Sequence, residues 1–149
     1  MSGLHLPDEQ ATENFGRALA PLLRPGDVVA LFGTLGAGKT SLSRGILLGL
    51  GHDGEVASPT FPIVQTYEPP DVSLPVWHVD LYRIEAAHEL EELGLDEALM
   101  DSALLIEWPE RLPSLWPDTL QLRLDHDPRG GRNLTASVPT AWERRWPPR

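Results

Sequence analysis

The 149-residue chain contains no cysteine, which excludes disulfide bonds and thiolate metal sites. No stretch approaches the roughly 20 consecutive apolar residues that a membrane-spanning helix needs. Residues 1–8 lack both a basic start and a long apolar run, so they do not resemble a signal peptide. The lack of a membrane span and of a signal peptide predicts a cytoplasmic protein that does not enter a membrane, whereas the lack of cysteine does not reveal the compartment.

Positive charge is also scarce, since the formal net charge is −10 and the chain has eleven arginines but one lysine. Proteins that grip nucleic acid directly usually present a basic face. Direct tight binding of RNA is therefore disfavoured, and no role on DNA is predicted. The one obvious cationic cluster is Arg144, Arg145 and Arg149. We expect it to be solvated, within a flexible tail over residues 140–149.

Hydrophobic periodicity predicts an alternating α/β order in the first third of the chain. Residues 9–23 repeat apolar side chains on one helical face, and Asp8 precedes them as an N-cap. Residues 28–32 form an unbroken apolar run, as expected for a strand buried on both faces. A glycine-rich loop and a helix over residues 39–50 follow, and Gly51 ends that helix.

The remaining pattern completes one domain over residues 1–149. The elements predicted there are an antiparallel strand pair (61–67 and 76–80), a helix (86–93), a buried strand (103–106) and a hairpin (119–125 and 133–138). Together they predict a mixed, mostly parallel central sheet with antiparallel additions.

The glycine-rich segment 33–40, Gly-Thr-Leu-Gly-Ala-Gly-Lys-Thr, matches the phosphate-loop pattern G-x-x-x-x-G-K-[ST]. Glycines let backbone N–H groups wrap around phosphate oxygens, and the following helix adds its N-terminal dipole. Lys39 would place its charge on the β- and γ-phosphates, and Thr40 would offer a hydroxyl to Mg²⁺. The match lies between a predicted buried strand and a predicted helix. It therefore predicts ATP binding with Mg²⁺ and a three-layer P-loop NTPase-like fold.

Two carboxylates end predicted strands and are candidates for the magnesium site. Glu107 follows the apolar residues 103–106, and Asp80 follows residues 76–79. The sequence leaves open which of the two contacts the metal directly and which acts through water. His78 should share a strand face with Asp80, and a buried, hydrogen-bonded histidine is the expectation there.

Four other side chains have both a functional and a structural interpretation. Thr60 lies twenty residues after Thr40, where switch-type NTPases sense the γ-phosphate, but it also fits a turn before a strand. Trp108 at the rim would cover the nucleotide, contact a partner, or simply pack. Arg83 and Arg44 are candidates for stabilising phosphate charge, although a surface ion pair is the expectation for Arg44.

Four motifs in order give the chain a specific resemblance. They are residues 33–40, Ser58-Pro59-Thr60-Phe61, His78-Val79-Asp80-Leu81-Tyr82-Arg83 and Glu107-Trp108-Pro109-Glu110. With the opening Leu6-Pro7-Asp8-Glu9-Gln10-Ala11-Thr12, this pattern resembles the TsaE family of bacterial P-loop ATPases, formerly called YjeE. The resemblance runs from about Leu6 to Leu124.

The resemblance implies a role in making threonylcarbamoyladenosine beside the anticodon of transfer RNA. It implies an ATPase, weak alone, that works with the proteins TsaD and TsaB and meets transfer RNA through that complex. Thr40 and Glu107 would hold Mg²⁺, and Asp80 would support the metal or the attacking water. The catalytic candidates are Lys39, Asp80 and Glu107. The candidates for the rim of the site or for a partner contact are Trp108 and Arg83. The residues implied to bind ATP are Glu9, Thr12, Gly33, Thr34, Leu35, Gly36, Ala37, Gly38, Lys39, Thr40, Ser41 and Thr60.

Three other functions are alternatives to a partner-coupled ATPase. A small-molecule kinase needs a lid, and residues 68–75 are short and acidic for one. A GTPase switch needs an [NT]-K-x-D guanine motif, which is absent because Lys39 is the only lysine. A non-catalytic nucleotide-sensing scaffold would have the same sequence features, so the sequence leaves it open.

Overall fold

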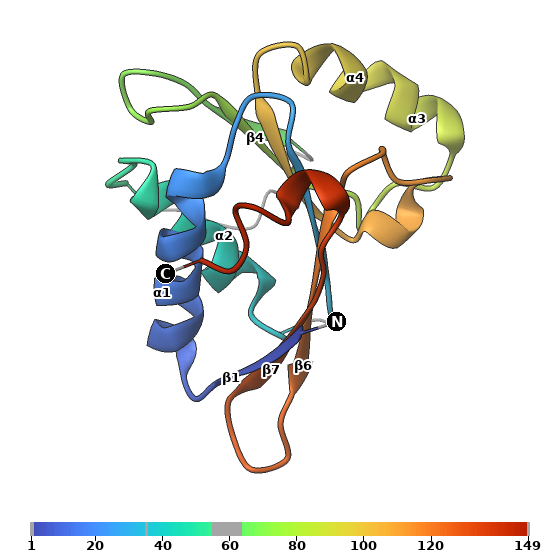
Figure 1. Ribbon diagram of the computed structural model, residues 1–149. Helices are drawn as coiled ribbons and strands as arrows, with labels where there is room; N and C mark the ends of the chain where they lie inside the picture. The colour runs from blue at the N-terminus through green and yellow to red at the C-terminus, as the bar shows by residue number, and fades with distance from the viewer. Residues whose placement is uncertain (1, 35, 55–63, 149) are drawn as a thin grey trace.

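A computed structural model describes residues 2–34, 36–54 and 64–148. In chain order its elements are β1 (Ser2–Leu6), α1 (Glu9–Leu19), η1 (Ala20–Leu22), β2 (Val28–Phe32), α2 (Lys39–Gly49), β3 (Val64–Tyr67), β4 (Val76–Asp80), α3 (Ala87–Glu92), α4 (Leu95–Ala98), β5 (Ala103–Glu107), η2 (Pro109–Arg111), β6 (Leu120–His126), β7 (Arg132–Ser137) and η3 (Thr140–Trp142) (Figure 1). Across these ranges, no helix combines the length and apolarity needed to cross a membrane.

One seven-stranded sheet carries the fold, in the order β1-β7-β6-β2-β5-β4-β3. The four central strands β6, β2, β5 and β4 are mutually parallel, while β1, β7 and β3 are added antiparallel. The predicted mixed sheet with antiparallel additions is confirmed. Residues 61–63 of the predicted strand 61–67 lie outside the described residues.

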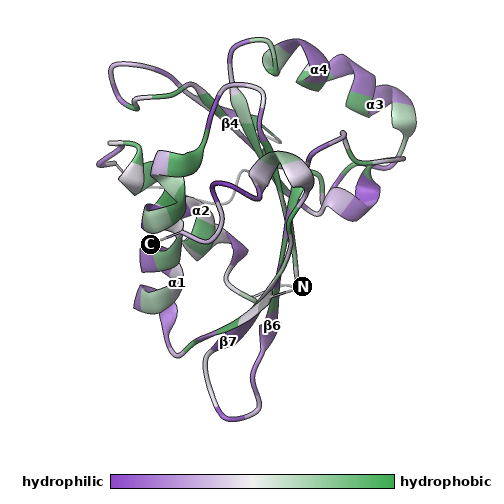
Figure 2. Cartoon of the chain, in the orientation of Figure 1, coloured by the Kyte–Doolittle hydropathy of each residue, from purple (hydrophilic) through white to green (hydrophobic). Residues whose placement is uncertain are grey.

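Helices cover both faces of the sheet, so the predicted three layers are confirmed. On β2, Val29 and Leu31 join the core beneath α1 and α2, whereas Val28 joins a second core beneath α3 and α4. The strand alternates between two buried faces, which explains its unbroken apolar sequence. Figure 2 shows this as hydrophobic colour along the central strands between the two helical layers.

Close contact between α1 and α2 fixes where the first turn of α1 lies. A Cβ added at Gly16 would collide with the Leu42 carbonyl, and one at Gly45 would collide with the Glu13 carbonyl. Only glycine permits the two backbones to approach so closely. The approach places the N-terminal turn of α1 beside the start of α2, which directly follows the phosphate loop.

Some element boundaries differ from the sequence predictions for local reasons. The predicted helix 9–23 is α-helical only to Leu19 and continues as the 3₁₀ turn η1, which contains Pro21. The sequence analysis missed α4, a four-residue helix, and also β1, which pairs only with the sheet edge at β7. α4 is too short to show a helical period, and β1 contains Gly3, a residue type depleted in strands.

The end of the chain is packed, and the expectation of a flexible tail is wrong for residues 140–148. Trp142 is fully buried in the core beneath α1, and Trp146 contacts Phe15 edge to face at 5.9 Å between ring centroids. Arg145 pairs with Asp27 at 2.7 Å. Two aromatic residues in this short segment bury enough apolar surface to hold it in place.

Candidate nucleotide-binding site

A cleft of about 570 Å³ lies at the carboxyl ends of β2, β4 and β5. Ligands of open α/β sheets bind outside these strand ends. The lining residues are Pro7, Asp8, Glu9, Thr12, Gly36, Gly38, Lys39, Thr40, Ser41, Asp80, Tyr82, Glu107, Trp108, Gly131 and Arg132. They come from the phosphate loop, the start of α1, the ends of β4 and β5, and the β6–β7 hairpin.

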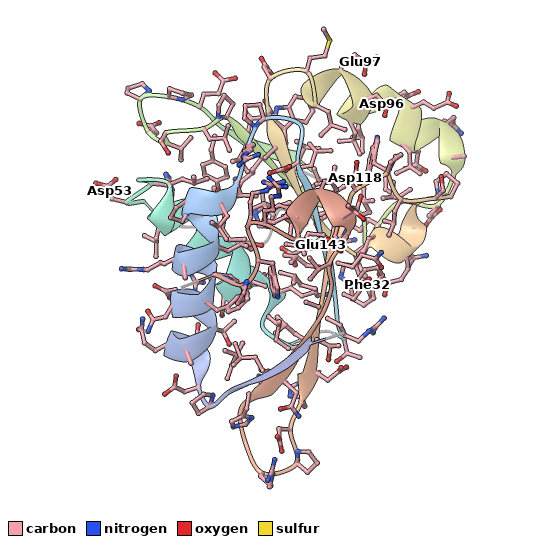
Figure 3. All side chains as sticks on the ribbon, in the orientation of Figure 1. Phe32, Asp53, Asp96, Glu97, Asp118 and Glu143 are labelled. Atoms are coloured by element: carbon pink, nitrogen blue, oxygen red, sulfur yellow. The ribbon has the colours of Figure 1, made fainter. Side chains whose placement is uncertain are left out.

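The phosphate loop has the backbone geometry that its glycines predict. Gly33, Gly36 and Gly38 have φ angles of 147°, 77° and 104°, which residues with side chains rarely adopt. Gly38 is also the N-cap of α2, so the positive end of that helix faces the cleft. The loop follows Phe32, the last residue of β2, which Figure 3 labels well below the acidic Asp96 and Glu97 of α4 in this view.

Lys39 lies at the floor of the cleft, where its side chain turns back onto its own loop. Its Nζ donates a 2.7 Å hydrogen bond to the Gly33 carbonyl and lies 3.7 Å from the centroid of the Trp108 ring. The residue is only 5% exposed. Burial lowers the pKa of Lys39 below its usual 10.5, against the opposing field of Glu107, Glu110 and Asp80.

The two carboxylates predicted from the sequence are neighbours across the sheet. Asp80 and Glu107 are register partners at the ends of the parallel strands β4 and β5. Strand alternation directs both toward the α2 face, together with Val76 and Leu105 of the core beneath that helix. Both are nearly buried, and Asp80 Oδ1 accepts a 2.9 Å hydrogen bond from the Tyr82 backbone N–H.

His78 forms a hydrogen bond with Glu107, so the expected buried, hydrogen-bonded histidine is confirmed. Its Nε2 lies 2.6 Å from Glu107 Oε2, and the imidazole is completely buried. Within the described part of the chain, His78 Nδ1 has no hydrogen-bond partner. The contact fixes one oxygen of Glu107 while the same side chain lines the cleft.

Trp108 has a strained backbone that brings its ring over the lysine. It lies in the left-handed region, with φ 59° and ψ 51°, immediately before Pro109. Such a conformation costs on the order of 1–3 kcal/mol for a non-glycine residue and concentrates at functional sites. Its ring also packs at 4.9 Å from Tyr82. Trp108 and Tyr82 thus form an aromatic wall beside Lys39.

The first turn of α1 forms the opposite wall. Asp8 caps the helix by accepting a 2.7 Å hydrogen bond from the Ala11 N–H, as predicted. Glu9 accepts hydrogen bonds from Ser41 Oγ at 3.1 Å and Arg44 Nη1 at 3.3 Å. The expected surface ion pair of Arg44 is therefore confirmed, and it ties α1 to α2 at the cleft.

Comparison with known proteins identifies the family of this chain. The family model described as "Threonylcarbamoyl adenosine biosynthesis protein TsaE" matches residues 6–134. The chain belongs to the TsaE family. A Streptomyces coelicolor protein named tRNA threonylcarbamoyladenosine biosynthesis protein TsaE is 48% identical over 112 residues, covering 74% of this chain and 76% of that protein. A Rickettsia bellii protein of the same name is 40% identical over 134 residues, covering 87% and 92%.

A solved structure shares the TsaE-family fold seen here. The crystal structure of YdiB from Bacillus subtilis superposes with a TM-score of 0.80 at 29% sequence identity. The match covers 96% of this chain and 89% of that one. The predicted family and fold are thus confirmed together.

The structure places most of the TsaE-family candidate residues in one cleft, with some exceptions. Gly33, Thr34 and Ala37 belong to the loop without lining the cleft, and Arg83 is exposed outside it. Leu35 and Thr60 lie outside the described residues, so their predicted roles stay predictions. The residues that line the cleft as candidates are Glu9, Thr12, Gly36, Gly38, Lys39, Thr40, Ser41, Asp80, Glu107 and Trp108.

The sequence analysis missed Arg132, which comes to the cleft from the far end of the chain. The only sequence signal is its place after Gly130-Gly131 in a predicted hairpin. That signal does not tell which loop the hairpin meets. The meeting depends on β6 pairing directly with β2, a register that local pattern does not specify.

Proposed function

We propose that this TsaE-family chain is a Mg²⁺-dependent ATPase that supports threonylcarbamoyl transfer to the adenosine beside the anticodon of transfer RNA. TsaD and TsaB are the proposed partners. One observation carries the ATPase part. A single cleft combines the lysine and hydroxyl of a phosphate loop with two carboxylates at neighbouring strand ends.

The oxygen donors in the cleft fit a magnesium ion. The Thr40 hydroxyl and the carboxylates of Asp80 and Glu107 are hard ligands, and Mg²⁺ is commonly held by one or two carboxylates together with substrate phosphates. When bound, the ion would neutralise the charge that develops on the transferred phosphoryl group.

The chain's own residues bind the phosphates, stabilise their charge and orient the attacking water. Backbone N–H groups of residues 33–40 and the N-terminus of α2 hold the phosphates. Lys39 exchanges its bond to the Gly33 carbonyl for phosphate oxygens, and burial strengthens its electrostatic effect there. Whichever of Asp80 and Glu107 is not a direct ligand orients the attacking water.

The cations at the cleft support slow turnover by the isolated protein. Among the described lining residues they are Lys39 and Arg132, and three donor groups of Arg132 are already bound to backbone carbonyls. An arginine supplied by a partner contributes a factor on the order of 10³–10⁵ in rate to enzymes of this class. The net charge of −10 further supports contact with transfer RNA through the partners, in the cytoplasm.

The test is ATP hydrolysis measured with the purified chain alone and with TsaB and TsaD. We expect slow phosphate release alone and a large stimulation by both partners. The matched control is Lys39→Arg, which keeps the charge but replaces a compact ammonium with a planar fork, and it should lose hydrolysis. Rapid turnover by the chain alone would contradict partner activation. ATP binding without turnover under any condition would favour the nucleotide-sensing scaffold instead.

A further inference from the structure

Arg132, the first residue of β7, bonds the phosphate loop from the side. Its Nε donates to the Ala37 carbonyl and its Nη2 to the Gly36 carbonyl, both at 3.0 Å. A third bond, from Nη1 to the Gly131 carbonyl at 3.0 Å, fixes the guanidinium to its own hairpin. The side chain therefore links two segments that are 95 residues apart in sequence.

These bonds fix the direction of the loop's peptide groups. The Gly36 carbonyl shares a planar peptide with the Ala37 N–H, which donates to the Thr34 carbonyl at 3.1 Å and closes a turn of the loop. The Ala37 carbonyl shares a planar peptide with the Gly38 N–H. Because each peptide is planar, holding the carbonyl oxygen also holds the N–H direction. A loop that binds phosphates through its N–H groups needs those directions fixed before the ligand arrives.

The hairpin that presents Arg132 is itself firmly anchored. Asp127 accepts a 2.8 Å hydrogen bond from the Arg129 N–H in the turn, and these Arg129 contacts lower the Asp127 pKa to about 2. Gly131 has φ 78°, and a Cβ there would collide with the Leu6 carbonyl and with Pro7. The hairpin thus rests against the β1–α1 connection, which forms the other wall of the cleft.

We propose that Arg132 is a positioning residue that holds the phosphate loop in its phosphate-binding shape. The inference rests on the proposed nucleotide site and extends it to the C-terminal hairpin. Arg132 acts through Gly36 and Ala37 and does not read the base or the γ-phosphate. Its loss should therefore weaken every ligand bound through the loop by a similar factor.

The test is a set of binding titrations on Arg132→Ala with ATP, ADP and inorganic triphosphate, each with Mg²⁺. Losing two charge-assisted hydrogen bonds to the loop should raise each Kd about tenfold to a hundredfold. Inorganic triphosphate has no base or ribose, so its weakening isolates the phosphate loop. A loss seen for ATP but not ADP would make Arg132 a γ-phosphate contact and overturn the inference.

The matched control is Arg123→Ala, which removes the same charge from β6 of the same hairpin. Arg123 lies outside the cleft, near the Phe32 ring at 5.1 Å, so its Kd values should match wild type. Titrations are run well below the melting temperature of each variant, so that lost stability alone does not change the measured affinity. If wild type itself bound none of the ligands, the proposed function would fail, whereas wild-type affinity in Arg132→Ala would refute only this inference.

Two further variants test the mechanism without relying on Arg132→Ala alone. Arg132→Lys keeps the charge but has one donor atom for two carbonyls, so its Kd should lie between those of wild type and Arg132→Ala. Gly131→Ala leaves Arg132 intact but forces the hairpin away from Leu6, and it should weaken all three ligands in the same proportion. Unchanged Kd values in a folded Gly131→Ala protein would contradict the proposed role of the hairpin.

Discussion

Two arginines lie at the two ends of strand β2, and each donates hydrogen bonds to backbone carbonyls. At the carboxyl end, Arg132 bonds the carbonyls of Gly36 and Ala37. At the amino end, Arg145 bonds the Leu22 carbonyl at 2.7 Å and pairs with Asp27, also at 2.7 Å. The Arg145 guanidinium further lies 3.8 Å from the centroid of the Trp142 ring.

The partners of the two arginines show how the ends of the sheet differ. Arg145 is neutralised by a carboxylate and covered by an aromatic ring, so its contacts serve the fold alone. Two hydrogen bonds of Arg132 go to carbonyls of the phosphate loop beside the cleft, and a third goes to the Gly131 carbonyl of its own hairpin. The arginine at the carboxyl end of β2 lies at the ligand site, whereas the arginine at the amino end stabilises the fold. Three experiments break or sharpen this contrast.

The largest effect should come from Glu107, the carboxylate proposed to bind Mg²⁺ at the cleft end. Glu107→Gln keeps the shape that contacts His78 but removes the charge proposed to hold Mg²⁺. We expect hydrolysis to fall by a factor on the order of 10²–10³, as when one transition-state contact is removed, with a nearly unchanged melting temperature. Phosphate release with TsaB and TsaD present, and thermal unfolding, are the two measurements.

The control for that variant is Glu110→Gln, which changes the same charge three residues later at an exposed position outside the cleft. It should retain most of the activity. If Glu107→Gln kept full hydrolysis while Asp80→Asn lost it, the direct ligand would be Asp80 and the assignment to Glu107 would be wrong.

The amino end should show the opposite pattern, with stability lost and ligand binding kept. Arg145→Ala removes the partner of Asp27, whose side chain is 13% exposed. The Arg24 N–H still donates to Asp27 at 2.7 Å, so we expect the free energy of unfolding to fall by about 2–3 kcal/mol. Urea unfolding measures this change, and ATP titration at low temperature should give the wild-type Kd.

Arg144→Ala is the natural control, because the neighbouring arginine is exposed and carries the same charge. Its unfolding free energy should stay within about 0.5 kcal/mol of wild type. A wild-type stability in Arg145→Ala would mean that the Arg145–Asp27 pair contributes nothing to the stability of the fold. A weaker ATP affinity in folded Arg145→Ala would contradict the proposed difference between the two ends of β2.

How far the sequence alone predicts this molecule depends on how local each feature is. The phosphate loop, the Asp8 cap and the two carboxylates that end apolar runs follow from local sequence. The pairing of β4 with β5, which makes Asp80 and Glu107 neighbours, is a long-range contact that was not predicted. The place of Arg132 does not follow from local sequence either, because its target is set by the β6–β2 register, and neither does that of Arg145, because an arginine-rich end resembles a solvated tail. Long-range packing decided both.

The smallest expected effect is a change in the rate at which the Lys39 amine is chemically labelled. Because the chain has no other lysine, side-chain labelling reports on the cleft end alone. An amine-selective reagent can modify only Lys39 and the α-amino group of Met1, and peptide mass mapping separates the two. Reaction requires the neutral amine, which is favoured here because burial lowers the pKa of Lys39. Labelling should therefore begin at lower pH than for an ordinary lysine, and Mg·ATP should slow it severalfold by covering Nζ and favouring its protonated form. AMP, which lacks the β- and γ-phosphates, should protect poorly.

Arg145→Ala should show the same protection of Lys39 as wild type, whereas Arg132→Ala should need more Mg·ATP to reach that protection. Equal labelling of wild type with and without saturating Mg·ATP would mean that Lys39 does not meet the phosphates, and the proposed nucleotide site would fail with it.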